Sequence, residues 1–163
     1  MKIEEKWVYP ASGDAVYAMI VDPLFQESKC AATKAVDYRV DIEPDGAGHT
    51  VTSRRTMSTS SFPSQFKSFV AETLEIVETQ AWGAPETGGG RIAQLTVEIA
   101  GAPIGMTGTL TATPSGDSTQ MTLNGNLKAR IPLIGAKIEQ AAEPAIVAAI
   151  HSEAATGKKY LSR

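Results

Sequence analysis

The chain has 163 residues, of which 42% are hydrophobic and 20% are charged, and its formal net charge is -3. A chain of this length usually forms one domain that buries a core without disulfides or metal ions, so we expect a single domain over residues 1–163. The mild negative charge argues against nucleic acid as a partner, because phosphate binding needs a concentrated basic patch.

Cysteine content and hydropathy indicate in which cellular compartment the protein is expected. Cys30 is the only cysteine, which excludes an internal disulfide and a thiol-rich metal site. The start of the chain is charged and lacks the apolar stretch of a secretory signal. No run of about 18 apolar residues is present to span a membrane. We therefore expect a cytoplasmic protein without stable membrane insertion, either a monomer or a weak homodimer.

The first part of the chain predicts one strand followed by two short helices. Residues 2–9 alternate between apolar and polar side chains, as a half-buried strand does. Ser12 is a typical N-cap for a first helix with apolar residues at helical spacing. Asp22 followed by Pro23 repeats the signal, and the second helix is expected to run to about Thr33.

The middle of the chain predicts six short strands. The segments that alternate between apolar and polar residues are 36–43, 50–58, 73–82, 92–100, 106–112 and 121–131. Tight turns rich in glycine separate most of them, beginning with Asp45 and Gly46. Strands joined in succession in this way predict an antiparallel meander and not a parallel sheet.

A long helix is predicted from Pro132 onward, where the apolar spacing changes from two residues to about 3.6. We expect it to reach Thr156, with Gly157 as its C-terminal cap and a bend at Pro144. Its apolar stripe is predicted to hold Ile134, Ile138, Ala141, Ala142, Ala145 and Ala149.

Small side chains are predicted on both walls of the interior. The helix stripe is rich in alanine, and the facing strands contribute Ala93, Gly108, Ala112, Gly125 and Ala129. Small residues either bring two walls together or leave space between them. A curved sheet around a bent helix favours a cavity, whereas the alternative is a close-packed core. Glycine in a strand also marks a bend, which weakens the inference from the two glycines.

Three of the four phenylalanines occur at helical spacing in a serine-rich connector. Phe62, Phe66 and Phe69 would form one apolar face of a short helix. Such a face is a portal flap, a membrane-touching patch, or a simple cover over the open end of the core. Ile104, in an apolar hairpin tip, is a further portal candidate, although a plain hairpin turn explains it equally well.

The sequence holds no evident catalytic constellation. His49 and His151 are the only histidines, and no further ligands stand at metal-binding spacing, so we expect no metal, no cofactor and no catalytic residue. Glu72 and Glu78 share a strand face with apolar residues. If one of these two carboxyl groups pointed into the interior, it would act there as a general acid, a general base or a polar anchor for a ligand. Exposure at the sheet edge is the favoured interpretation, because buried unpaired carboxylates are costly.

The order strand, two helices, six-strand meander and long terminal helix resembles the START-like (SRPBCC) superfamily. This helix-grip fold is shared by lipid-transfer domains, the birch-pollen allergen family and polyketide cyclases. Residues 129–139, with Trp82 closing its strand, are similar to an uncharacterised family of this superfamily found mainly in actinobacteria. The resemblance covers essentially the whole chain. It implies an α+β fold in which a curved antiparallel sheet of about seven strands grips the C-terminal helix around a hydrophobic cavity. It supplies no catalytic residues.

We therefore expect binding or carriage of a hydrophobic or amphipathic small molecule, such as a lipid, an isoprenoid or a polyketide-like compound. One alternative is a cyclase- or hydratase-type enzyme, whose ionisable groups would come from Tyr38, Arg55, Glu72 and Glu78. Another alternative is a ligand-free interaction module with a filled core. The residues expected to line the cavity are Tyr38, Val40, Met57, Leu74, Trp82, Leu95, Val97, Leu110, Leu123, Leu127, Ile138, Ala142, Ala145 and Ala149.

Overall fold

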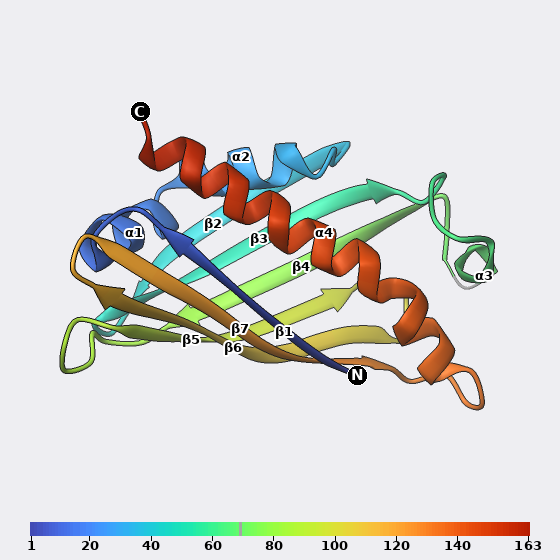
Figure 1. Cartoon of the computed structure of the whole chain (residues 1–163). Coiled ribbons are helices and arrows are strands. Elements are labelled where there is room, and N and C mark those ends of the chain that lie inside the picture. Colours follow the sequence, from blue (N-terminus) through green and yellow to red (C-terminus); the bar gives the residue numbers. More distant parts are fainter. Residues whose placement is uncertain (69) are drawn as a thin grey trace.

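A curved antiparallel sheet of seven strands holds one long helix across its concave face (Figure 1). The structure, a computed structural model, describes residues 1–68 and 70–163. The elements in chain order are β1 (Lys2–Tyr9), α1 (Gly13–Ile20), α2 (Pro23–Ala32), β2 (Asp37–Asp45), β3 (Gly48–Ser58), α3 (Ser64–Lys67), β4 (Thr73–Trp82), β5 (Arg91–Ile99), β6 (Ile104–Ser115), β7 (Ser118–Ala129) and α4 (Gly135–Leu161). This order confirms the predicted helix-grip fold.

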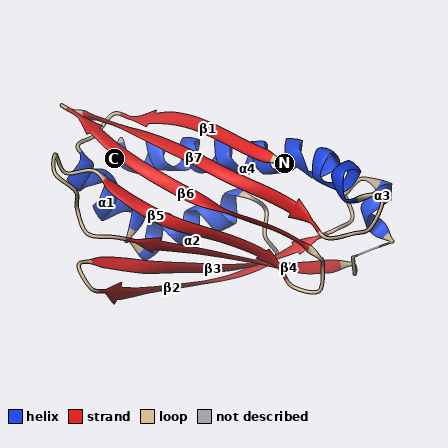
Figure 2. Cartoon of the chain, turned by 90° about the horizontal axis from the view of Figure 1, so that it is seen from below, coloured by secondary structure: helices blue, strands red, loops and turns tan. Residues whose placement is uncertain are grey.

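Both short helices begin where the sequence predicts. The Ser12 hydroxyl accepts a hydrogen bond from the Ala15 amide at 3.2 Å, and the Asp22 carboxylate accepts one from the Leu24 amide at 2.9 Å. Each side chain satisfies a backbone donor that the first turn of a helix leaves without a partner. Together the two helices cover one end of the sheet on the same side as α4 (Figure 2).

The strand order across the sheet is β1-β7-β6-β5-β4-β3-β2, so β1 and β2 are the edges and β5 lies in the middle. Every neighbouring pair is antiparallel, which the meander predicts. The register places one row of side chains on the face toward α4, here called the inner face. Across the sheet this row consists of Val40, Ser53, Glu78, Val97, Met106 and Leu127.

The helix α4 is longer than predicted, and Gly157 is not its cap. The helix continues to Leu161, and Gly157 is buried within it. A Cβ atom at Gly157 would lie 2.5 Å from the Tyr9 ring, so glycine is needed here for close packing against β1. Pro144 lies inside the helix on its exposed side, where the missing backbone donor does not interrupt the core.

Two strand glycines do not open the interior. A Cβ atom at Gly108 would lie 2.1 Å from the backbone oxygen of Asn124, and one at Gly125 would lie 2.8 Å from the sulfur of Met106. Glycine therefore permits close backbone and side-chain contact between β6 and β7, so of the two predicted alternatives these positions bring the walls together. Ala93, Ala112 and Ala129 are likewise buried in the core.

The backbone of α4 comes close to the sheet only toward one edge. In the part of the chain that the structure describes, the backbone of α4 packs most closely against β1, β7, α1 and α2, and it makes few or no close approaches to β3, β4 and β5. Side chains must therefore bridge a wider separation at the other half of the sheet. No helix in the described residues is long and apolar enough to cross a membrane.

Candidate functional site

The inner face of the two central strands is buried unevenly. Near α1, Trp82 and Leu95 are fully buried. Toward α3, Ile76, Val97 and Ile99 are only half-buried, although they belong to the interior strands β4 and β5. A close-packed protein interior would cover such side chains completely. The inner face is therefore closed near α1 and incompletely filled near α3, which we call the open end.

The helix shows the same partial burial on its inner side. Ala142, Ile146 and Ala149 are half-buried and point to the side of α4 that also carries the buried residues Ile138 and Ile150. Partly accessible apolar side chains therefore occur on both the sheet and the helix. This arrangement lies where the backbone of α4 stands away from β4 and β5.

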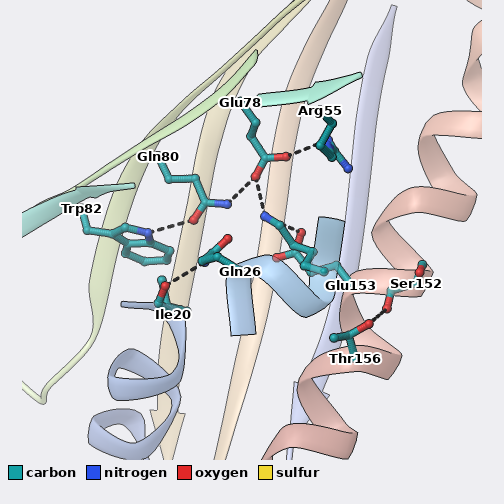
Figure 3. A network of polar contacts seen from close by, with 10 residues as sticks. Ile20, Gln26, Arg55, Glu78, Gln80, Trp82, Ser152, Glu153 and Thr156 are labelled. Atoms are coloured by element: carbon teal, nitrogen blue, oxygen red, sulfur yellow. Dashed lines mark hydrogen bonds and ion pairs between the residues drawn. The ribbon is translucent and has the colours of Figure 1, made fainter. Parts of the chain in front are cut away.

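A group of charged and polar side chains lies beneath this apolar region. The polar cluster consists of Lys29, Arg55, Glu78, Gln80 and Glu153, which come from α2, β3, β4 and α4. The Lys29 ammonium lies 2.7 Å from Glu78 and 3.4 Å from Glu153, and Arg55 lies 3.4 Å from Glu78. Figure 3 shows Glu78 between Arg55 and Gln80, with Glu153 approaching from α4.

A chain of hydrogen bonds fixes the cluster to the sheet. The Gln80 amide donates to Glu78 at 2.7 Å, and the Trp82 indole donates to the Gln80 oxygen at 3.0 Å. These three side chains alternate along β4, so their order follows from the strand repeat of two residues. Glu78 is thus oriented by Lys29, Arg55 and Gln80 (Figure 3).

The two carboxyl groups of the cluster have opposite pKa shifts. Burial by itself would raise the pKa of Glu78, but Lys29 and Arg55 outweigh burial and lower the pKa from 4.5 to about 2. Burial raises the pKa of Glu153, and the Glu78 carboxylate adds to that rise while Lys29 opposes it. The site therefore combines a firmly ionised carboxylate with a carboxyl group that holds a proton more readily.

The cluster has hydrogen-bonding capacity that the protein does not use. Within the described residues, the buried Nε of Arg55 has no hydrogen-bond partner. The Glu153 side chain is 22% exposed and is the most accessible acidic group of the cluster.

The predicted lining residues fall into three groups. Leu74, Trp82, Leu95, Leu110, Leu123, Leu127 and Ile138 are buried in the core. Val40, Met57, Val97, Ala142 and Ala149 are half-buried on the inner face or the inner side of α4. Tyr38 is 40% exposed, and Ala145 lies on the exposed side of α4. The structure thus brings most of the predicted residues to one interior, whereas Tyr38 is partly exposed and Ala145 faces solvent.

Two of the predicted portal residues lie at the open end. Phe62 and Ile104 are half-buried and pack against Ala129 and Ile138, where β7 ends and α4 begins. The side chain of Phe66 and the whole of Phe69 lie outside the described residues.

The prediction that sheet-edge exposure is favoured for the two glutamates is wrong for Glu78. This side chain is 12% exposed and faces inward, and its negative charge is neutralised by Lys29 and Arg55. Glu72 is exposed, as is Tyr38. Of the four ionisable groups predicted for an enzyme, only Arg55 and Glu78 therefore face the interior.

Sequence reasoning missed Lys29 and Glu153, and both had a detectable signal. Lys29 shares a helical face with Phe25 and Cys30, so the helical spacing alone predicts that its side chain faces the interior. Glu153 follows Ile150 by three residues along the inner side of α4. A charged residue inside an apolar helical stripe is a sign of a buried ion pair.

Two surface pockets lie on the sheet. One of about 260 Å³ is lined by Arg39, Asp41 and Arg54 among others. The other, of about 410 Å³, lies at the β5–β6 hairpin, where Val97, Ile99 and Ile104 of the open end line it together with Lys128 and Arg130. Neither is lined by a residue of α4. The polar lining of the smaller pocket is typical of a solvated groove on the outer face of a sheet.

Comparison of the sequence with protein families gives one match. The model described as "Protein of unknown function (DUF2505)" matches residues 5–161. No curated protein matches the sequence at a significant level.

Known structures share the fold at low sequence identity. The STAR-related lipid transfer protein fragment from Xanthomonas axonopodis has a TM-score of 0.66 and 13% identity, over 99% of this chain and 86% of that chain. The Zhui aromatase/cyclase from Streptomyces sp. R1128 has a TM-score of 0.63 and 11% identity, over 99% and 95%. A START superfamily protein from Mycobacterium smegmatis has a TM-score of 0.58 and 11% identity, over 99% and 97%. The chain therefore has a START-like fold.

Proposed function

The chain belongs to the DUF2505 family, and because it has a START-like fold we propose that it binds a hydrophobic or amphipathic small molecule between the sheet and α4. Lipids, isoprenoids and polyketide-like compounds have the required chemistry. The molecule would enter at the open end and contact Val97, Ala142 and Ile146. Burial of its apolar surface would supply the driving force, at about 25 cal/mol per Å².

The observation that carries this proposal is the partial burial of Ile76, Val97 and Ile99 on the inner face of central strands. A filled core would leave these side chains without accessible surface. The fold neighbours support the same interpretation, since a lipid transfer protein and an aromatase/cyclase are among them.

The polar cluster would orient the ligand. Binding sites for small molecules are mostly apolar and hold a few polar groups that fix the direction of the ligand. Glu153 is the more accessible carboxyl group, and burial raises its pKa. When ionised it would accept a hydrogen bond from a ligand hydroxyl group, and when protonated it would donate one to a ligand carbonyl oxygen. A ligand with one oxygenated end and one apolar end fits this arrangement.

A pair of tryptophan variants tests the proposal. Ala142→Trp places a large ring on the half-buried inner side of α4, whereas Ala145→Trp places the same ring on the exposed side. In a titration with a fluorescent fatty acid, we expect Ala142→Trp to weaken binding at least about tenfold, since the ring fills the space that the ligand needs.

Ala145→Trp is the matched control and should bind as the wild type does. Equal binding by both variants would place the ligand elsewhere, and absence of uptake by the wild type for a panel of apolar ligands would overturn the proposal. Circular dichroism checks that both variants keep the fold.

The opposite pKa shifts of Glu78 and Glu153 favour a second candidate, a cyclase-type enzyme that acts in the same interior. A carboxyl group with a raised pKa is better suited than an ordinary glutamate to protonate a carbonyl oxygen as general acid. Mass spectrometry of a linear β-polyketone incubated with the protein would then detect loss of water on ring closure. The activity must disappear in Glu153→Gln, and no turnover by the wild type would exclude this candidate for that substrate class.

A further inference from the structure

Leu133 stands entirely in solvent at the tip of the loop between β7 and α4. Its exposed fraction is 103%, and its φ angle is +69°. This left-handed conformation is costly for a leucine and is taken more easily by glycine or asparagine. The residue therefore costs strain, and its exposed side chain contributes no apolar burial in return. An apolar side chain held at this cost is expected to serve a contact outside the fold.

The loop around Leu133 is held firmly in place, and residues 130–134 are here called the docking loop. The Arg130 amide donates to the Pro103 oxygen at 2.7 Å, and the Gly135 amide donates to the Ile131 oxygen at 2.9 Å. Ile131 and Ile134 also pack with Ala129 and Ile138. The backbone thus anchors both ends of the loop, which leaves Leu133 pointing away from the core.

Along the chain, the residues around the docking loop carry a positive charge, in contrast to the net charge of -3 for the whole sequence. In space, the exposed Glu98 shares a surface pocket with Lys128 and Arg130, so the basic residues outnumber the acidic one there. Residues 118–138 contain Lys128, Arg130 and Lys137 and no acidic residue. All three basic side chains are exposed. The next acidic residue, Glu139, is buried, with one oxygen 3.2 Å from the N-terminal ammonium and the other accepting from the Ala129 amide at 2.9 Å.

We propose that the docking loop binds the surface of an anionic lipid bilayer, with Leu133 inserting among the lipids and Arg130 and Lys137 contacting the headgroups. Exposed apolar residues beside basic ones are the usual pattern of reversible interfacial binding. One protruding side chain is too small to supply the apolar area of a stable protein interface, which buries about 800 Å² on each partner.

The position of the loop gives the docked molecule an orientation. Ile131 and Ile134 pack in the same group as Phe62, which lies at the open end of the inner face. Figure 1 shows this end, with α3 and the start of α4 on the same side of the molecule. Docking would turn the open end toward the bilayer. This orientation rests on the proposed function, whereas the docking itself does not.

Vesicle flotation tests the docking. The probes are vesicles of phosphatidylcholine alone and vesicles in which about a third of the lipid is phosphatidylglycerol. We expect the wild type to bind the anionic vesicles and to lose binding at high salt. Leu133→Asn introduces a polar side chain that tolerates the left-handed conformation. We expect it to lower the association constant for anionic vesicles about tenfold or more.

Two further variants separate the apolar from the electrostatic contribution. Leu24→Asn removes a leucine that is 48% exposed on α2 and should bind vesicles as the wild type does. The double variant Arg130→Gln with Lys137→Gln should lose about tenfold on anionic vesicles only.

The proposal is overturned if the wild type does not float with anionic vesicles, or if Leu133→Asn binds them as well as the wild type. Concentration-dependent dimerisation that Leu133→Asn abolishes, without vesicle binding, would assign the loop to a second copy of the chain instead. Titration of Leu133→Asn with a fluorescent fatty acid in the absence of vesicles tests the interior separately, and wild-type affinity is expected there.

Discussion

Lys29 holds the polar cluster together, because its buried ammonium group joins β4 and α4 from its place on α2. Removing a charged group from water is expensive and is offset only where partners and hydrogen bonds are close. Here the ammonium lies 2.7 Å from Glu78 and keeps a raised pKa, since the attraction of two carboxyl groups outweighs its burial. Such a buried pair contributes little net stability but fixes which side chains face one another.

The opposite shifts of the two carboxyl groups predict a distinctive pH dependence of stability. Glu78, with its lowered pKa, contributes stability that is present above pH 4.5 and is lost as the pH falls to about 2. Glu153, with its raised pKa, contributes stability that is present below pH 4.5 and is lost as the pH rises through that raised value.

Replacing Glu153 by glutamine removes the second contribution. We therefore expect the free energy of unfolding of Glu153→Gln to rise relative to that of the wild type between pH 4.5 and pH 8, as measured by urea denaturation. Glu143→Gln, an exposed change on the same helix, should follow the wild-type profile. Parallel profiles for Glu153→Gln and the wild type would contradict the assigned shift.

At the scale of elements, the long helix shows what the spacing of apolar residues predicts correctly and what it does not. The change of apolar period at Pro132 correctly predicts a helix, and Ile138 and Ala142 lie on its inner side. The predicted stripe then continued to Ala145, which is exposed, because alanine carries little information about which face is buried. The branched residues Ile146 and Ile150 mark the true inner side.

The packing of α4 against β1 predicts an unusual response to an alanine substitution. Gly157→Ala would gain up to about 1 kcal/mol of helix propensity. Its new methyl group would however lie 2.5 Å from the Tyr9 ring, and overpacking of this kind costs about 1–3 kcal/mol. We therefore expect net destabilisation in urea denaturation.

The reverse change at the exposed position Ala155 supplies the control for that measurement. Ala155→Gly should cost about 1 kcal/mol through helix propensity alone. A Gly157→Ala variant as stable as the wild type would mean that α4 can shift away from Tyr9 without cost.

At the scale of the molecule, the order of elements was enough to predict the fold, because an antiparallel meander followed by one long helix has few ways to bury both apolar faces. The polar cluster could not be predicted in the same way. Its residues come from four elements, and only the register of β3 and β4 and the docking of α2 and α4 bring Arg55, Glu78, Lys29 and Glu153 together. Strand phase indicated an inward Glu78 but could not supply its partners.

Native mass spectrometry tests the central claim, a ligand held between the sheet and α4, most directly. The protein, purified without detergent and incubated with a mixture of fatty acids and isoprenoid alcohols, should appear with one bound molecule. The bound fraction should fall sharply in Ala142→Trp and stay unchanged in Ala145→Trp. A wild-type spectrum that holds only the unliganded chain, or equal ligand retention by both tryptophan variants, would contradict the claim.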